Sequence, residues 1–239
     1  MLAGNIVQVR LERKALSAAV SPTCCSGREQ RSKTASAGSA IPVRMKATLR
    51  KQMRTQRRAL STAEHRRRSL LAAKAVLGLP MFRAGKRIAL YLPFDRETDT
   101  SALLAAARRR GVRIFVPVIV DRRHARIRFY PLDRRTRSGV FGIAVPSRLT
   151  RPVSPRCLDL IVIPLVGVDT QGRRLGMGGG FYDRALEFRR RRGHWPGPRL
   201  VGLAFDCQRT ESRFADNWDV SLDSLATESG LLHYLKGTP

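Results

Sequence analysis

A glycine-rich segment from Arg173 to Arg184 carries the clearest chemical signal in this chain of 239 residues. Four of the five positions from Gly176 to Gly180 are glycine, and residues without a Cβ let backbone N–H groups approach an anion closely. The segment follows an apolar run and precedes a pattern typical of a helix, whose N-terminal amides favour negative charge. Arg173, Arg174 and Arg184 add positive charge. This combination predicts a phosphate-binding loop.

The predicted phosphate loop does not belong to the common types. The pattern G-x-x-x-x-G-K-[ST] is absent, and Gly176-Met177-Gly178 is followed by Gly179 and Gly180 instead of the spacing of a dinucleotide fingerprint. A glycine turn without a ligand is the alternative. The position after a buried strand, at the edge where open α/β sheets bind ligands, favours phosphate binding.

Two aspartates could add a metal ion to this loop. Asp183 follows the glycines directly, and its carboxylate could hold a Mg2+ that bridges bound phosphates; alternatively it only stabilises the first turn of a helix. Asp219 lies in a polar C-terminal segment and could supply a second oxygen ligand, although an ordinary loop aspartate would look the same. The sequence contains neither a C-x-x-C nor an H-x-x-x-H pair, and this absence argues against a zinc or redox site.

Two helices are predicted upstream of the sheet. From Lys46 onwards, apolar or uncharged side chains recur at helical spacing. This stripe consists of Leu49, Met53, Gln56 and Leu60, with Arg50, Arg54, Arg57 and Arg58 around it. Ser61-Thr62-Ala63-Glu64 then has the pattern of a capping box and predicts the start of a second helix. That helix carries the apolar residues Leu70, Ala73 and Leu77.

The rest of the chain alternates between strand and helix patterns. A strand, a helix and a strand within about 30 residues form a βαβ unit, which implies a parallel sheet. The predicted elements are strands at 86–92, 112–116, 126–130, 158–163 and 200–205, the last of these being the final strand, and helices at 101–110 and 181–192. Residues 121–157 are otherwise irregular. The predicted fold class is α/β: one three-layer domain with a mostly parallel open sheet flanked by helices.

Composition excludes several classes of protein. Hydrophobic residues make up 43% and charged residues 27%, which is typical of a globular protein rather than a disordered or fibrous one. The longest apolar run, 160–168, is about half of what a membrane-spanning helix needs. The net charge of +28 favours a nucleic-acid binder, but the arginine runs fall in separate predicted helices and aromatic residues are only 6%. We therefore expect neither a membrane nor a nucleic-acid partner.

Residues 1–44 differ from the rest, since they are rich in Ser, Ala and basic residues and show little apolar periodicity. We expect a disordered extension, or a start site upstream of a true first residue at Met45, with the folded domain at 45–239. The alternative is a transit peptide, which has a similar composition. The expected location is the cytoplasm, or an organelle if the extension is a transit peptide.

An ordered series of motifs resembles the 5-formyltetrahydrofolate cyclo-ligases, also called methenyltetrahydrofolate synthetases. The series covers about residues 46–230. Its members are 46–50 with 57–61, 90–100, 159–169 running into 172–176 and 180–184, 206–208, and 218–219. The long motif between Asp159 and Asp183 is the most specific part of the resemblance.

The resemblance implies an ATP- and Mg2+-dependent enzyme that converts 5-formyltetrahydrofolate to 5,10-methenyltetrahydrofolate and releases ADP and phosphate. We expect a monomer. Transfer of the γ-phosphoryl group to the formyl oxygen would create a leaving group, and N10 of the folate would then attack the activated carbon. Such chemistry needs positioning and charge neutralisation more than a covalent nucleophile. A non-catalytic relative or a basic RNA-binding protein is the alternative.

The resemblance also implies roles for individual residues. Arg174 and Tyr182 match catalytic positions, and Asp183 and Asp219 match the magnesium ligands. The implied ATP contacts are Lys46, Arg50, Arg174, Leu175, Gly176, Met177, Gly178, Gly179, Gly180, Phe181 and Tyr182. The implied folate contacts are Leu92, Glu97, Met177, Gly178, Gly179, Gly180 and Phe181. Some relatives carry basic residues where this chain has Met177 and Gly179, so the phosphate charge would fall to Arg173, Arg174, Lys46 and Arg50.

Overall fold

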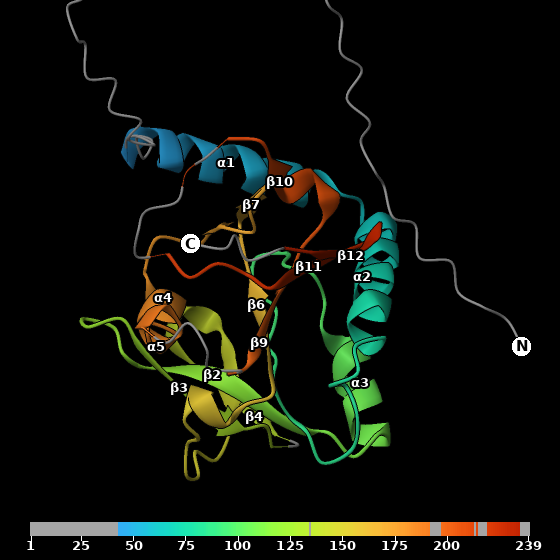
Figure 1. The fold of residues 1–239 in the computed structure, drawn as a ribbon, viewed down its shortest axis with the longest axis vertical. Helices are drawn as coiled ribbons and strands as arrows, with labels where there is room; N and C mark the ends of the chain where they lie inside the picture. Colours follow the sequence, from blue (N-terminus) through green and yellow to red (C-terminus); the bar gives the residue numbers. More distant parts are fainter. Residues whose placement is uncertain (1–42, 134, 192–196, 213, 215–218, 235–239) are drawn as a thin grey trace, which may run out of the picture. The chain divides into compact units, whose positions relative to one another are not determined.

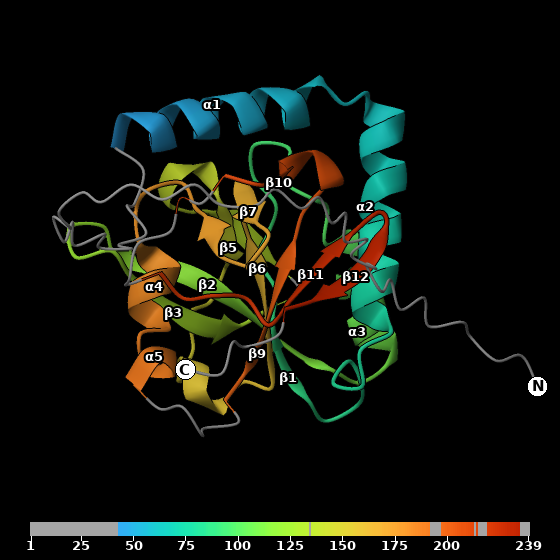
Figure 2. The same ribbon diagram turned by 45° about the horizontal axis from the view of Figure 1, so that its top comes forward.

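A seven-stranded sheet forms the centre of the molecule in the computed structural model, which describes residues 43–133, 135–191, 197–212, 214 and 219–234. The strand order is β12-β11-β9-β6-β1-β2-β3 (Figures 1 and 2). The five strands from β11 to β2 are parallel, and β12 and β3 pair antiparallel at the two edges. These strands are β1 (Arg87–Ala89), β2 (Arg113–Asp121), β3 (Arg126–Pro131), β6 (Leu160–Pro164), β9 (Arg199–Leu203), β11 (Ser224–Thr227) and β12 (Gly230–His233).

The helices lie on both faces of this sheet, which confirms the predicted three-layer fold. Figures 1 and 2 show α2 (Thr62–Leu77) and α3 (Ser101–Arg109) on one face, and α4 (Phe181–Ala185) and α5 (Phe188–Arg191) on the other. A further helix, α1 (Val43–Ala59), crosses one end of the sheet. Among the described residues, no helix has the length and apolar character needed to cross a membrane.

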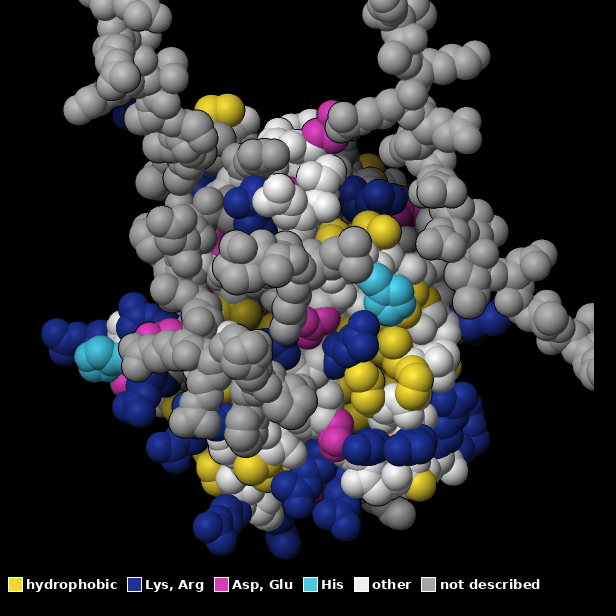
Figure 3. Space-filling view, viewed as in Figure 1, with side chains coloured by type: hydrophobic (Ala, Val, Ile, Leu, Met, Phe, Trp, Pro, Cys, Tyr) yellow, Lys and Arg dark blue, Asp and Glu magenta, His cyan; other side chains and the backbone are white. Residues whose placement is uncertain are grey.

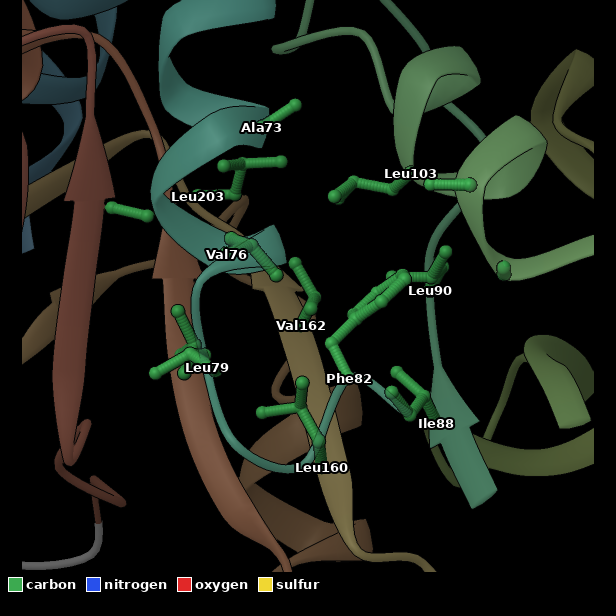
Figure 4. Packing of buried hydrophobic residues seen from close by; sticks show 14 of the residues in the cluster. Ala73, Val76, Leu79, Phe82, Ile88, Leu90, Leu103, Leu160, Val162 and Leu203 are labelled. Atoms are coloured by element: carbon green, nitrogen blue, oxygen red, sulfur yellow. The ribbon is translucent and has the colours of Figure 1, made fainter. Parts of the chain in front are cut away.

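Alternation along the strands produces two cores. Ile88, Leu160 and Val162 point toward α2 and α3, as Figure 4 shows, whereas Ala89 and Ile161 belong to the opposite core under α4 and α5. Successive side chains of a strand point to opposite faces, and strands covered on both sides read as continuous apolar runs. The continuous run at 158–163 therefore predicted its doubly buried strand correctly.

The described part of the chain also contains two smaller sheets and three 3-10 turns. The three-stranded sheet has the order β10-β7-β8, and a two-stranded hairpin pairs β4 with β5. The bounds are β4 (Thr136–Ser138), β5 (Ala144–Pro146), β7 (Gly167–Asp169), β8 (Arg174–Leu175) and β10 (Arg209–Thr210), with 3-10 turns at Val140–Gly142, Pro155–Cys157 and Asp206–Gln208.

Several predicted elements were wrong in detail. The strand at 200–205 was predicted to be the final one, but β11 and β12 follow it. The sequence did not indicate β11, because its buried residues include Ser224 and Thr227 and it therefore lacks a continuous apolar run. The predicted helix at 181–192 is divided between α4 and α5, since the chain turns at Leu186 to bury that side chain completely. The hairpin of β4 and β5 was missed because β4 is three residues long and fully exposed.

The apolar stripes of both N-terminal helices also differ from the prediction. On α2, Leu70 is exposed, and the buried face consists of Ser69, Ala72, Ala73 and Val76, small side chains that bring the helix close to β11. On α1, Gln56 is exposed and Arg57 is buried. The predicted extension at 1–44 lies outside the described residues except for its last two positions, which begin α1.

Candidate functional site

The two predicted site segments follow β1 and β6, which are neighbours in the sheet. The chain continues from β1 through α3 to β2 on one side, whereas β6, β9 and β11 lie on the other side. Strand order therefore reverses between β1 and β6. Open α/β sheets bind ligands in the crevice outside the carboxyl ends of the strands at such a point. The topology thus brings residues 90–99 and 165–180 to one place.

A short hairpin, β7 and β8, presents the glycine-rich loop. Its turn is organised by the buried Asp169 carboxylate, which accepts hydrogen bonds from the backbone N–H groups of Gln171 and Arg173, each at 2.9 Å. The same carboxylate pairs with Arg173 Nε at 2.8 Å. Part of the positive charge predicted beside the loop is therefore neutralised within the protein.

The loop itself, residues 176–180, adopts a backbone that favours glycine. Gly178 has φ +99° and Gly180 has φ +65°, values that side-chain-bearing residues rarely adopt. Met177, directly before Gly178, is exposed. The helix that follows, α4, has only five residues, so its dipole adds less to the loop than a full helix would, contrary to our expectation.

Helix α1 reaches the glycine-rich loop from a distant part of the chain. Arg50 Nε donates a hydrogen bond to Gly176 O at 2.8 Å, across 126 positions of sequence. A Cβ built on Gly178 would lie 3.7 Å from Arg50 Cζ. Lys46 lies one helical turn before Arg50, on the same face of α1. The structure therefore brings the predicted N-terminal ATP contact Arg50 to the predicted phosphate loop.

Arg174 and Asp183 form a partly buried ion pair beneath the loop. Arg174 Nη2 lies 2.6 Å from Asp183 Oδ1, and its side chain is only 4% exposed. The backbone of Val220 contacts both partners, because its C=O accepts from Arg174 Nη1 at 2.9 Å and its N–H donates to Asp183 Oδ1 at 3.2 Å. The backbone of Asp219, which directly precedes Val220, therefore lies near Asp183. The described contacts of Asp183 engage Oδ1, which leaves Oδ2 as a further oxygen ligand of the kind that Mg2+ prefers.

Aromatic and apolar residues line the side of α4 that faces the sheet. Tyr182 packs against the core, and Arg174 Cζ lies 5.9 Å from its ring centroid. Burial is the main cause that raises the pKa of the Tyr182 phenol well above its ordinary value, and the negative charge of Glu97 is the second. The phenol of Tyr182 is therefore neutral at physiological pH.

The predicted ATP contact Leu175 is buried beside Met53 of α1.

The loop after β1 carries the predicted folate contacts. Leu92 packs beside the small core formed by Val116 and Val118. Glu97 is partly buried, and its Oε2 accepts a hydrogen bond from Phe94 N at 3.1 Å. Burial raises the pKa of Glu97 to about 7, although the hydrogen bond from Phe94 and the charge of Arg57 act in the opposite direction. Near neutral pH, Glu97 is therefore expected to be present in both its protonated and its ionised form.

Sequence reasoning missed a cluster of arginines around Asp95. The Asp95 carboxylate accepts from Arg54 Nη2 at 2.9 Å, Arg57 Nη2 at 3.2 Å and Arg58 Nε at 2.7 Å. Arg57 is 1% exposed, and its burial lowers the pKa of its guanidinium. The helical pattern had placed Arg57 outside the apolar stripe of the predicted helix. The only signal for its partner was the position of Asp95 within the motif at 90–100.

Many of the other carboxylates are also engaged inside the protein. Examples are Asp159 with Lys86, Asp169 with Arg173, and Asp223 with Arg189. Figure 3 shows Lys and Arg side chains gathered over the lower half of one face, around α3 and the loops beside it, with few acidic side chains between them. The excess positive charge is therefore carried largely by the surface.

Comparison with known proteins identifies the family. The family model of the 5-formyltetrahydrofolate cyclo-ligase family matches residues 42–228. The 5-formyltetrahydrofolate cyclo-ligase of Haemophilus influenzae is 34% identical over 185 residues, which span 74% of this chain and 97% of that protein. The corresponding Escherichia coli K12 protein is 33% identical over 182 residues, with the same two coverages.

A solved structure agrees with these relatives. The NMR structure of Aquifex aeolicus 5,10-methenyltetrahydrofolate synthetase superposes with a TM-score of 0.68 at 30% identity, covering 82% of this chain and 95% of that one. The match extends over almost the whole length of that protein, and the family match at residues 42–228 includes both segments of the site. The chain therefore belongs to the 5-formyltetrahydrofolate cyclo-ligase family.

Proposed function

We propose that this chain converts 5-formyltetrahydrofolate to 5,10-methenyltetrahydrofolate with ATP and Mg2+, in the crevice between the loops that follow β1 and β6. The observation that carries the proposal is the hydrogen bond from Arg50 to Gly176 O. It joins two segments that the resemblance assigns to ATP, although they are far apart in the sequence.

The glycine-rich loop is proposed to hold the ATP phosphates. Gly178, with its positive φ and no Cβ, lets the phosphates approach the backbone. Arg50 and Lys46 of α1 are proposed to supply the facing positive charge. Arg173 and Arg174 contribute less than the sequence suggested, since each already pairs with an aspartate.

The reaction is proposed to proceed in two steps. The formyl oxygen first attacks the γ-phosphorus, the bond to the β-phosphate oxygen breaks, and ADP leaves. N10 then attacks the activated carbon, the carbon–oxygen bond breaks, inorganic phosphate leaves with the former formyl oxygen, and N10 loses its proton. Positioned cations accelerate both steps because they neutralise charge on the transferring phosphoryl group.

Asp183 and Asp219 are proposed to hold Mg2+. The ion would neutralise phosphate charge when bound. Arg174 would then orient the metal ligand, because its ion pair with Oδ1 fixes the Asp183 carboxylate and leaves Oδ2 for the metal. The catalytic role of Arg174 stays a prediction, and we propose that it acts through Asp183.

The folate is proposed to lie against the loop after β1. Glu97 would hydrogen-bond the donor N–H groups of the pterin, with Leu92 and Phe181 as apolar neighbours and Tyr182 at the reacting end. The proximity of Glu97 to Tyr182, which is close enough for its charge to act on the phenol, supports a single pocket shared by both loops. A monomeric, cytoplasmic enzyme remains the expectation from the sequence.

The growth of methenyl absorbance tests this proposal. Purified protein is mixed with 5-formyltetrahydrofolate, Mg2+ and ATP, and each component is omitted in turn. Growth that requires all three supports the cyclo-ligase reaction. No growth from a protein with native circular dichroism would identify a non-catalytic relative, and salt-dependent RNA binding would then be measured as the alternative.

A further inference from the structure

One carboxylate holds three arginines of α1. Asp95 is only 11% exposed and accepts from Arg54, Arg57 and Arg58. Arg57 Nη2 also donates to the Asp95 carbonyl at 2.8 Å. The three arginines occupy positions i, i+3 and i+4 of the helix, so they share one face. Charge-assisted hydrogen bonds of this kind are the strong ones.

The same face of α1 continues to the glycine-rich loop. Arg50 lies one turn before Arg54, and Lys46 lies one turn before Arg50. Arg50 and Arg57 are seven residues apart, which is about 10 Å along a helix. One end of this face therefore contacts the loop at Gly176, and the other end contacts the loop that carries Glu97.

Between these ends the apolar contact of α1 spans about one helical turn. Met53 packs with Val166, Leu175 and Phe214, with Leu49 of the preceding turn against the same cluster, and Met53 fills the space in which a Cβ on Gly167 would lie. So short a contact fixes the direction of a 17-residue helix poorly, so a further fixed point is needed. The cluster around Asp95 supplies that point. Without it, the buried Arg57 would lose the carboxylate that accepts its hydrogen bond, and three neighbouring guanidinium groups would repel one another.

We propose that Asp95 is a positioning residue for the nucleotide: by holding Arg54, Arg57 and Arg58, it fixes α1 in the orientation that places Arg50 and Lys46 against the glycine-rich loop. Asp95 does not touch the nucleotide in this proposal, which rests on the function proposed above. Its loss should weaken nucleotide binding even when no folate is present. A role confined to the folate loop would not have this effect.

Asp95→Asn is a suitable test variant. The side chain keeps its size, and Asn tolerates the positive φ of 51° at this position as well as Asp does. The substitution removes the negative charge and replaces one acceptor oxygen by an NH2 group, which cannot accept from an arginine. Glu64→Gln on α2 is the matched control, because Glu64 also accepts from two arginines, Arg67 and Arg68, but at a site without contact to the glycine-rich loop.

The experiment measures ADP binding by isothermal titration with Mg2+ and without folate, followed by KM for ATP and for 5-formyltetrahydrofolate. We expect Asp95→Asn to weaken ADP binding on the order of ten-fold, as the loss of about one strong charged contact would. KM for ATP should rise similarly. Glu64→Gln should match the native chain.

A second variant covers the case in which Asp95→Asn does not fold. Arg54→Gln with Arg58→Gln removes the two partly exposed arginines and leaves the buried Arg57 paired, and we expect it to weaken ADP binding about three-fold. ADP affinity equal to native in a folded variant, or a change confined to KM for folate, would overturn the proposal. A native chain that binds no ADP would instead refute the proposed function.

Discussion

Replacing Glu97 by Gln should remove a pH-dependent loss of stability. The Glu97 carboxyl is partly buried, and burial raises its pKa to about 7, whereas an ordinary glutamate has a pKa of about 4.3–4.5. The folded protein therefore holds a proton on Glu97 that the unfolded chain has already released at pH 6. Gln keeps an oxygen that can accept from Phe94 N, so the main change is the loss of titration.

The sign and size follow from proton linkage. Stability falls with rising pH wherever the folded state binds more protons than the unfolded state, so the cost of Glu97 is nearly absent at pH 4, grows as the pH rises, and is complete at about pH 8. Raising the pKa from 4.5 to about 7 corresponds to about 3 kcal/mol in total, most of which appears between pH 5 and pH 8. The free energy of unfolding of Glu97→Gln should therefore rise relative to the native chain by that amount across this range.

Denaturant unfolding of both proteins at several pH values measures this difference. Glu64→Gln is the control, because Arg67 and Arg68 lower the pKa of Glu64 to about 2, and a group already ionised in both states adds no slope between pH 5 and pH 8. The reasoning would be refuted if the difference in free energy of unfolding between Glu97→Gln and the native chain stayed constant, within about 0.5 kcal/mol, between pH 5 and pH 8. Glu97 would then be an ordinary charged carboxylate at neutral pH.

Two further predictions concern the glycine-rich loop. Gly178→Val should abolish ADP binding in a titration, because a branched residue cannot adopt φ +99° and its side chain would enter the proposed phosphate site; native affinity would contradict the proposed geometry. Asp183→Asn should reduce turnover by about 100-fold or more with native circular dichroism, because a charged metal ligand is lost. Unchanged turnover would remove Asp183 from the mechanism.

Local signals predicted the elements of the fold well. Ser61 caps α2 as the capping-box pattern predicted, and its Oγ accepts from Glu64 N at 3.2 Å. The apolar run before the glycine loop became β6, buried on both faces. The sequence failed where tertiary packing replaced local pattern. β11 buries Ser224 and Thr227, and only its neighbours in the sheet make those polar residues suitable for a core strand.

The site was predictable in its segments but not in its connections. The glycine loop and the motif at 90–100 were both recognised from their residues, and the order of β1 and β6 in the sheet brings them together. The contact of Arg50 with Gly176 spans 126 positions, and no local periodicity encodes a contact of that range. For the same reason the pairing of Arg174 with Asp183 came only from the structure.

Carboxylates, not arginines, mark the important contacts in a chain with this composition. With 46 basic and 18 acidic residues, a basic side chain has few possible partners, whereas a carboxylate can collect several. Asp95 collects three arginines and buries one of them. Because an unpaired buried guanidinium is costly, the position of such a carboxylate constrains the helix that supplies the arginines. In this fold that helix is α1, which also carries Arg50. Asp95 lies in the loop after β1, whereas the proposed effect of its loss is weaker nucleotide binding at the glycine-rich loop.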